Sequence, residues 1–184
     1  MARVTELKKK FDKKGFRTDA SAGKVCCWYM TSALLFHSGF IPFSNILVFI
    51  LRAYGARIGK NVRIKPGIRI KYPWKLTIGD FSWLASCHID NLENIIIGKN
   101  VCISQEAMLL TGNHNYKTVS FDLAAQPIIL EDGAWIGAKG LVCPGVVVGS
   151  HAVLTAGSVA NRKMESYMIY QGNPAVIVRK REIL

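Results

Sequence analysis

Apolar residues recur with a strict period of six between residues 130 and 159. The repeated positions all hold branched aliphatic side chains: Leu130, Ile136, Val142, Val148 and Leu154. An α-helix repeats its apolar face about every 3.6 residues and a β-strand about every 2, so neither element alone explains this spacing. A short strand followed by a tight turn, repeated, does explain it. The pattern therefore predicts a parallel β-helix, in which each apolar residue points inward and stacks on its equivalents in neighbouring coils.

The same period extends upstream to residue 58, with three interruptions. The apolar positions before the third interruption are Ile58, Ile64, Ile70, Ile78, Leu84, Ile97, Ile103 and Leu109. The period shifts at residues 72–75 and near residues 90–91, and it stops between residues 111 and 126. A coil of three hexapeptides takes about 18 residues, so about five coils are predicted between residues 58 and 160. Residues 111–126 are polar and aromatic, and we expect them to leave the solenoid as a loop that can carry a site.

The residues before the repeat divide into two stretches of different character. Residues 1–24 are polar and basic, whereas residues 25–54 are mostly apolar and are interrupted at Ser38-Gly39. Each apolar piece has about a dozen residues, fewer than the ~20 that span a bilayer as a helix. They predict a helical hairpin that either packs on the β-helix or lies in a membrane interface beside the basic arm, and the sequence leaves both open.

These patterns predict a mainly β fold in two parts. Residues 1–54 are expected to form a basic arm plus an apolar helical segment. Residues 55–184 are expected to form the β-helix domain, with an excursion loop at 111–126 and a short C-terminal tail. The tail follows Gly172-Asn173-Pro174, a sequence that favours a turn.

The charge of the chain favours anionic partners. Lys and Arg number 24 against 12 Asp and Glu, which gives a formal net charge of +12. Such a balance suits nucleic acid, phosphorylated small molecules or an anionic membrane surface. The basic residues lie mainly at the two ends of the chain, and no nucleic-acid recognition motif is present, so nucleic acid ranks last among these partners.

The five cysteines and the N-terminal composition bear on the compartment. Five is an odd number and no CxxC spacing occurs, so we expect free, buried thiols in a reducing compartment. No stretch resembles a secretory signal, because the first apolar run starts only after residue 24 and lacks a cleavage site. We therefore expect a cytoplasmic protein, with contact at the inner face of the membrane left open.

Four histidines are the main candidates for chemistry, and His114 is the one that lies in the predicted excursion. A neutral imidazole can accept a hydroxyl proton at physiological pH, which suits a general base. From its position alone, His114 could equally be a general base or an ordinary loop histidine. A carboxylate or a carbonyl should orient the imidazole, and Asp122 and Glu106 are both candidates.

Four sequence motifs then make a family recognisable: the TGNH loop, the GAWIGAKGLVCPGVVVG segment, the TAGSVANRK segment and the final QGNPAVIVRKR. Together with the hexapeptides they resemble the left-handed β-helix O-acyltransferases, in the branch of colanic-acid and polysaccharide-biosynthesis acetyltransferases. The resemblance covers about residues 50–181. It implies a homotrimer with sites between subunits, acetyl-CoA as co-substrate, and a sugar or lipid-linked saccharide as acceptor. It also implies that His114 deprotonates the acceptor hydroxyl, which attacks the thioester directly.

The resemblance further implies which residues hold coenzyme A. Trp135 would line the cleft, small residues would lie along the pantetheine arm, and basic residues would meet the nucleotide and its phosphates. These positions are Trp135, Gly137, Ala138, Ala156, Gly157, Ser158, Arg162, Lys163, Arg179, Lys180 and Arg181. The small residues also suit tight corners of a solenoid, and a terminal basic run is often simply solvated. Asn161 and Arg162 stand where many relatives have Thr and Lys, and both changes keep the polarity.

Three other functions compete with this interpretation. One is an acetyltransferase for a soluble small molecule or antibiotic, which a soluble acceptor would distinguish. Another is a non-catalytic trimeric scaffold, which would need neither the loop histidine nor the Gly-Asn-Pro-Ala tail. A carbonic anhydrase-like zinc enzyme needs three histidines with two closely spaced, and the histidines here show no such pair, so we expect no metal.

Overall fold

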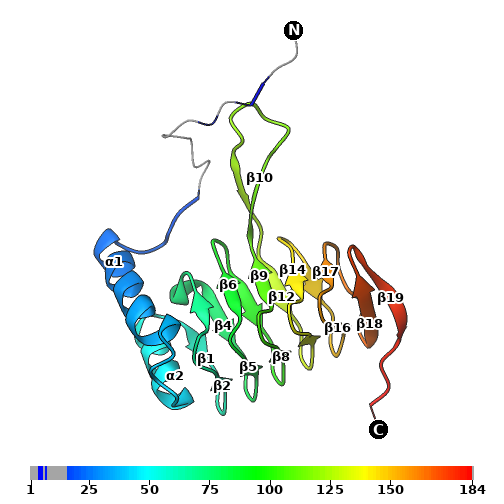
Figure 1. Cartoon of the computed structure of the whole chain (residues 1–184), viewed down its shortest axis with the longest axis horizontal. Helices are drawn as coiled ribbons and strands as arrows, with labels where there is room; N and C mark the ends of the chain where they lie inside the picture. The colour runs from blue at the N-terminus through cyan, green and yellow to red at the C-terminus, as the bar shows by residue number, and fades with distance from the viewer. Residues whose placement is uncertain (1–3, 6, 8–15, 184) are drawn as a thin grey trace.

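The computed structural model describes residues 4–5, 7 and 16–183. It confirms a mainly β fold: a left-handed parallel β-helix with a helical segment at its N-terminal end (Figure 1). The lysines of the predicted basic arm, at positions 8–10, 13 and 14, lie outside the described residues. All five cysteines are free, as expected, but Cys26 and Cys27 are exposed rather than buried.

Three parallel sheets form the sides of the solenoid. The first sheet holds β1 (Arg57–Ile58), β4 (Leu76–Ile78), β7 (Ile95–Ile97), β12 (Ile128–Leu130) and β15 (Val147–Val148). The second holds β2 (Arg63–Ile64), β5 (Trp83–Leu84), β8 (Cys102–Ile103), β13 (Trp135–Ile136), β16 (Val153–Leu154), β18 (Met168–Gly172) and β19 (Ala175–Lys180). The third holds β3 (Arg69–Ile70), β6 (His88–Asp90), β9 (Met108–Leu110), β14 (Leu141–Val142) and β17 (Val159–Ala160). The first and third sheets have five strands each, which matches the roughly five coils predicted between residues 58 and 160, and the second sheet continues beyond them with β18 and β19.

The six-residue period is the stacking of core residues on one another. Along the second sheet, the register pairs Leu84 with Ile103 and Ile136 with Leu154, and each of these side chains is at most 1% exposed. The stack continues beyond the recognisable repeat, because Leu154 pairs with the buried Tyr170 of β18. Because Tyr170 is aromatic, a search for branched aliphatic residues at every sixth position does not detect this last part of the stack. β19 then returns antiparallel to β18, so the C-terminal tail is a hairpin that extends the second sheet.

The helical cap consists of α1 (Ala22–Thr31), the π-helix η1 (Ser32–His37) and α2 (Ser44–Ala53). It packs on the first coil through Trp28, whose indole Nε1 donates to the carbonyl of Ile70 at 3.1 Å. The Trp28 ring also meets the rings of Phe36 and Tyr54 edge-on. With Phe36 and Leu47 fully buried, this face of the cap is part of the core.

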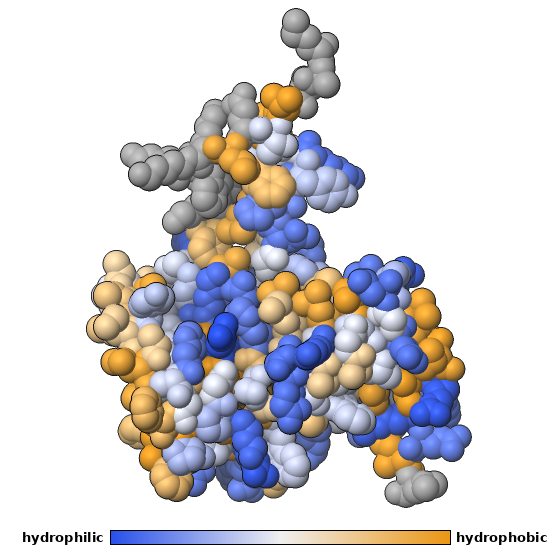
Figure 2. All heavy atoms as spheres, viewed as in Figure 1, coloured by the Kyte–Doolittle hydropathy of each residue, from blue (hydrophilic) through white to orange (hydrophobic). Residues whose placement is uncertain are grey.

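The opposite face of the cap is apolar and exposed. Figure 2 shows apolar residues along its outer side, and its exposed large side chains are Met30, Leu34, Phe40, Phe43, Ile46 and Phe49. The cap therefore packs on the β-helix with one face and exposes a second apolar face. Among the described residues, no helix has the length and apolarity needed to cross a bilayer.

The residues of the first interruption of the period bind the chain segment that precedes α1. The interruption forms a 3₁₀ turn, η2 (Pro73–Lys75), and Lys75 is only 5% exposed. The Lys75 ammonium donates to the carbonyls of Arg17 at 2.7 Å and Leu92 at 2.9 Å and pairs with Asp19 at 2.9 Å. These partners satisfy a buried charge that would otherwise be costly.

The non-periodic residues 111–126 form a hairpin. β10 (Gly112–His114) pairs antiparallel with β11 (Leu123–Ala125), and the hairpin projects away from the solenoid (Figure 1). It leaves the third sheet after β9 and rejoins the first sheet at β12, so it emerges at one corner of the solenoid.

Candidate active site

His114 is held in one orientation at the end of β10. Its Nδ1 lies 2.9 Å from the carbonyl oxygen of Phe121, and its ring stacks on the Phe121 ring with centroids 4.5 Å apart. Because a carbonyl oxygen can only accept, Nδ1 must carry the proton in this contact. The neutral imidazole therefore presents an unprotonated Nε2, which is the atom a general base needs.

The group that orients His114 in this contact is the main-chain carbonyl of Phe121. A carbonyl is one of the two kinds of group that the sequence analysis expected, although the residue was not identified. Glu106 instead pairs with Lys139 at 3.5 Å on the solenoid. Asp122 is buried, and its carbonyl accepts from the amide of Asn115 at 2.8 Å, which closes the hairpin loop. No side-chain pattern identifies a carbonyl partner, so the role of Phe121 was missed.

An aromatic groove runs along the outer face of the second sheet. Register pairing places Trp83, Cys102 and Trp135 side by side on β5, β8 and β13. The two indoles are about half exposed, and Trp135 Nε1 donates to Ser104 Oγ at 3.0 Å. A hollow of about 240 Å³ lies beside Trp83 and Ser104. Trp83 stands one position before the core residue Leu84, just as Trp135 stands one position before the core residue Ile136. The six-residue period could therefore have identified Trp83 as a residue of this face.

The small residues at the next corners differ in accessibility. A Cβ on Gly137 would lie 2.6 Å from the amide nitrogen of Ala156, so close coil packing requires glycine there. Ala138 is half-buried, whereas Ala156 and Gly157 are exposed. Ser158 is 1% exposed, and its Oγ accepts from the amide of Gly172 at 3.0 Å. The Ser158 side chain therefore fastens the C-terminal hairpin and is not presented to solvent.

The basic residues also divide into two groups. Arg162, Lys163, Arg179 and Lys180 are exposed, the last two on β19. Arg181 instead donates from Nη1 to the carbonyls of Gly133 at 3.0 Å and His151 at 3.1 Å. Its guanidinium ties the end of the chain to the solenoid, so the exposed residues are better placed to meet an anion.

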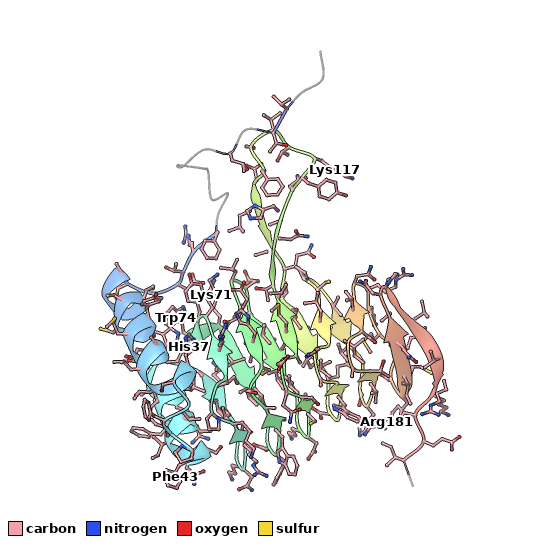
Figure 3. All side chains as sticks on the ribbon, in the orientation of Figure 1. His37, Phe43, Lys71, Trp74, Lys117 and Arg181 are labelled. Carbon is pink, nitrogen blue, oxygen red and sulfur yellow. The ribbon has the colours of Figure 1, made fainter. Side chains whose placement is uncertain are left out.

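A single chain does not bring His114 and the aromatic groove together. Figure 1 shows the β10–β11 hairpin projecting above the solenoid, while β5, β8 and β16 of the second sheet lie along its lower edge. Figure 3 likewise shows Lys117 of the hairpin far from Arg181 at the opposite side of the molecule. A site that uses both elements would need a second copy of the chain.

Solved structures with the same architecture define the class of the fold. A maltose O-acetyltransferase from Clostridium difficile 630 superposes with a TM-score of 0.79 at 22% identity, over 88% of each chain. A galactoside acetyltransferase in complex with coenzyme A superposes with a TM-score of 0.73 at 19% identity, over 89% of this chain and 85% of that one. A hexapeptide-repeat containing acetyltransferase from Vibrio cholerae has the same fold, with a TM-score of 0.77 at 22% identity over 89% of this chain and 96% of that one. No protein-family model matches the chain.

A relative of higher identity establishes the family itself. The chain is 37% identical over 169 residues to the colanic acid biosynthesis acetyltransferase WcaF of Escherichia coli (strain K12), which covers 91% of this chain and 92% of that protein. It is also 24% identical over 136 residues to the Escherichia coli galactoside O-acetyltransferase, over 71% of this chain and 66% of that protein. The protein therefore belongs to the hexapeptide-repeat acetyltransferases, in the group that contains the colanic acid biosynthesis enzyme.

Proposed function

We propose that the protein transfers an acetyl group from acetyl-CoA to a sugar hydroxyl in polysaccharide or glycoconjugate biosynthesis. The observation that carries the proposal is the 2.9 Å contact between His114 Nδ1 and the Phe121 carbonyl oxygen, which occupies Nδ1 as the donor and leaves Nε2 as the nitrogen that can accept a proton. Its acceptor class is suggested by relatives named for colanic acid and galactoside acetylation. Its donor is suggested by a solved relative that contains coenzyme A.

In the proposed reaction, Nε2 of His114 takes the proton of the acceptor hydroxyl while the hydroxyl oxygen bonds to the thioester carbonyl carbon. Collapse of the tetrahedral intermediate breaks the carbon–sulfur bond and leaves an acetyl ester. The imidazolium then returns the proton to the thiolate of coenzyme A. Main-chain amides at the solenoid corners would meet the developing oxyanion.

The cysteines support direct attack over an acyl-enzyme. Cys102 lies in the aromatic groove, but burial raises its pKa and keeps it a thiol. Burial also raises the pKa of Cys143, and it raises the pKa of Cys87 to about 12. Because the thiolate is the reactive form, none of these side chains is activated as a nucleophile.

The proposed assembly is a homotrimer in which the hairpin of one subunit meets the aromatic groove of the next. The separation of His114 from the groove within one chain supports it. The exposed indoles of Trp83 and Trp135 would then be covered by a neighbour and by the pantetheine arm. The His114 base and the thioester of acetyl-CoA would come close together only when the subunits assemble.

Acetyl-CoA binding tests the donor and the basic residues together. Calorimetric titration of the purified protein should show saturable binding near one site per chain. Replacing Arg179 and Lys180 by glutamine should weaken acetyl-CoA about tenfold, since each loses a charge-assisted contact to phosphate. Binding of a phosphate-free pantetheine analogue should not change. Equal loss for both ligands would contradict the phosphate role, and no binding to a folded trimer would contradict acetyl transfer.

The exposed face of the cap extends the proposal to a membrane-proximal, lipid-linked saccharide acceptor. A helical surface with aromatic side chains on one face can lie at the boundary between headgroups and acyl chains. Phe40, Phe43 and Phe49 are 84%, 65% and 71% exposed, and they face away from the solenoid core. The net charge of +12 would favour an anionic membrane surface.

Replacing Phe43 and Phe49 by serine should reduce co-sedimentation with phosphatidylglycerol vesicles about tenfold, because each loses a partly inserted ring. The matched control is Tyr116→Ser, which removes an exposed aromatic ring from the hairpin. Acetyl-CoA binding should be intact in both variants. Vesicle binding that falls equally in the control, or in neither variant, would contradict membrane contact through the cap.

A further inference from the structure

Positive charge is concentrated in the helical cap and the first coil of the solenoid. Residues 20–79 contain nine Lys and Arg and no Asp or Glu, whereas residues 80–184 contain eight Lys and Arg and nine Asp and Glu. The cap and the first coil therefore carry most of the net charge of +12, and the remaining coils are close to neutral. This distribution corrects the expectation that the basic residues lie mainly at the two ends of the chain.

Four of these cations form a basic collar on the coil that α2 covers. The collar consists of the exposed side chains of Arg57 on β1, Lys60 at the next corner, Arg63 on β2 and Lys65 after it. α2 is fastened to the same coil at both of its ends. Ser44 Oγ accepts from the amide of Ile64 at 2.8 Å. Arg52 Nη2 donates to the carbonyls of Ile58 at 2.8 Å and Gly59 at 2.7 Å. The collar is thus held at a fixed position relative to the cap.

The charges of the collar are not neutralised within the chain. None of the four side chains makes an ion pair with any residue that the structure describes. Arg63 lies over the Trp83 ring at 5.6 Å, a contact that leaves its charge in place. The carboxylate of Asp80 accepts from the main-chain amide of Lys60 at 2.7 Å and does not pair with the ammonium. The collar is therefore open to an external anion.

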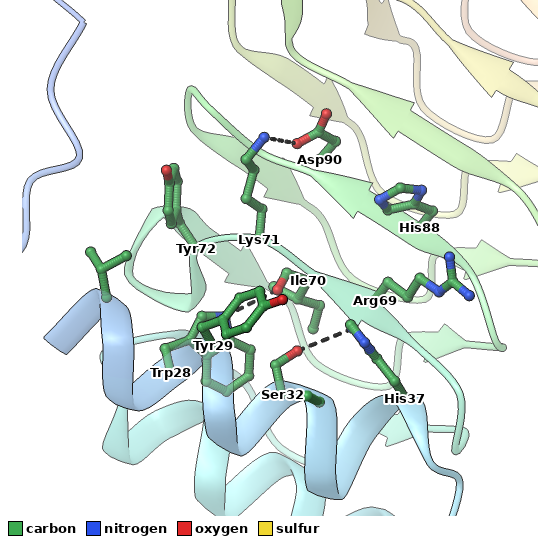
Figure 4. A pocket seen from close by; sticks show the side chains of 12 residues that line it. Trp28, Tyr29, Ser32, His37, Arg69, Ile70, Lys71, Tyr72, His88 and Asp90 are labelled. Atoms are coloured by element: carbon green, nitrogen blue, oxygen red, sulfur yellow. Dashed lines mark hydrogen bonds and ion pairs between the residues drawn. The ribbon is translucent and has the colours of Figure 1, made fainter.

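The other cations of the first coil have different surroundings. Arg69 and Lys71 line a pocket of about 530 Å³ between the cap and the first coils (Figure 4), and Lys71 pairs with Asp90 at 2.9 Å. Lys75 is buried and pairs with Asp19. These three residues are therefore not part of the collar.

The apolar face of the cap and the collar form two successive layers. Phe40, Phe43 and Phe49 are exposed on the outer side of the cap, and the collar lies on the coil behind α2. The separation is about 10–12 Å, the diameter of a helix with its side chains. A helix in a membrane interface buries its apolar face by about 5–10 Å. A bilayer presents matching layers in the same order, because acyl chains are followed by anionic phosphates, which guanidinium and ammonium groups bind.

We propose that the basic collar binds the phosphate groups of anionic lipids when the cap contacts a bilayer. The solenoid axis then lies roughly perpendicular to the membrane, with the cap end toward it (Figure 1). This inference rests on the proposed membrane contact of the cap and adds the residues that recognise the headgroup charge. In the proposed cyclic trimer, equivalent points of the three subunits lie in one plane, so three collars would meet the same flat surface. Simultaneous contacts would raise the affinity of the trimer above that of one collar.

The chain offers a matched pair of lysines for the test. Lys60 and Lys99 follow the stacked strands β1 and β7 at equivalent corners, and the amide of each donates to an aspartate carboxylate at 2.7 Å. Both side chains are exposed. Lys99 lies two strands farther from the cap, which is about 10 Å. Substitution of either lysine by glutamine removes the same charge from the same kind of turn.

Co-sedimentation of the full-length protein with phosphatidylglycerol vesicles, compared with phosphatidylcholine vesicles, measures the contribution of the headgroup charge. Lys60→Gln should weaken binding to phosphatidylglycerol about fivefold, and Arg57→Gln combined with Lys60→Gln should weaken it about 25-fold. Lys99→Gln should weaken it about twofold or less, because its distance from the surface exceeds the screening length. Raising the salt concentration should weaken binding of the unsubstituted protein more than binding of the double variant.

Equal losses in Lys60→Gln and Lys99→Gln, or equal binding to the two kinds of vesicle, would overturn the collar. In that case, a loss of binding in the Phe43→Ser, Phe49→Ser variant would show that the cap contacts the membrane without it. Absence of binding to both kinds of vesicle would overturn the collar together with the membrane contact of the cap. Lys60-dependent binding to heparin, with none to vesicles, would assign the collar to another polyanion and would also overturn the proposal. Retained acetyl-CoA binding shows that the variants are folded.

Discussion

Replacing His114 by alanine should lower kcat for acetyl transfer by roughly 10²–10⁴, the usual contribution of a positioned general base. The side chain is exposed on a hairpin, and its Nδ1 contact is to the main chain of the same hairpin, so its loss should not disturb the solenoid. The affinity for acetyl-CoA should therefore stay within about twofold, since only an interaction of the transition state is removed.

Steady-state release of free coenzyme A thiol, with sugar acceptors present, measures this effect. Tyr116→Ala, on the same loop, serves as the control for a general disturbance of the hairpin. Free imidazole in the assay should partly restore turnover to His114→Ala and should not affect Tyr116→Ala. Unchanged turnover in His114→Ala would remove the base from the mechanism, while a matching loss in Tyr116→Ala would assign the effect to the loop.

The fold was predictable because its core repeats a single local rule. Each inward residue is an aliphatic at a fixed phase, and neighbouring coils need only stack the same residue types on one another. The period failed where a different residue type fills the stack, as Tyr170 does, where extra residues form a turn, as at η2, and where the chain leaves the solenoid as the β10–β11 hairpin. The helical cap was predicted from its apolar composition, although the sequence could not decide whether it packs on the β-helix or lies in a membrane interface.

The finer features of the site depend on contacts between residues distant in the sequence. His37 and Arg69 are 32 positions apart and share a pocket only because the cap folds back onto the first coils. Arg181 looks like a solvated terminal cation, yet its donors meet carbonyls of the solenoid. Neither contact has a sequence period, so composition alone could not distinguish these arginines from the exposed ones.

The strand β7 offers a direct test of the phase of the repeat, because three consecutive isoleucines occupy it. Ile97 is 1% exposed and stacks between Ile78 and Leu130, whereas Ile96 is 43% exposed on the outer face. Ile97→Ala should lower the free energy of unfolding by about 2–5 kcal/mol, through lost burial and the cavity that remains. Ile96→Ala should cost about 1 kcal/mol or less, because a half-exposed side chain loses little burial.

Urea unfolding at one fixed protein concentration measures both variants, and the fixed concentration removes differences due to subunit assembly. The two substitutions delete the same atoms from adjacent positions of one strand, so intrinsic β-propensity cancels between them. Only the direction of the side chain differs. A larger cost for Ile96→Ala would mean that the strand lies one residue out of register, and this shift would turn every predicted core residue toward solvent. A cost concentrated at Ile97 would instead show that the six-residue period is a property of the packed core.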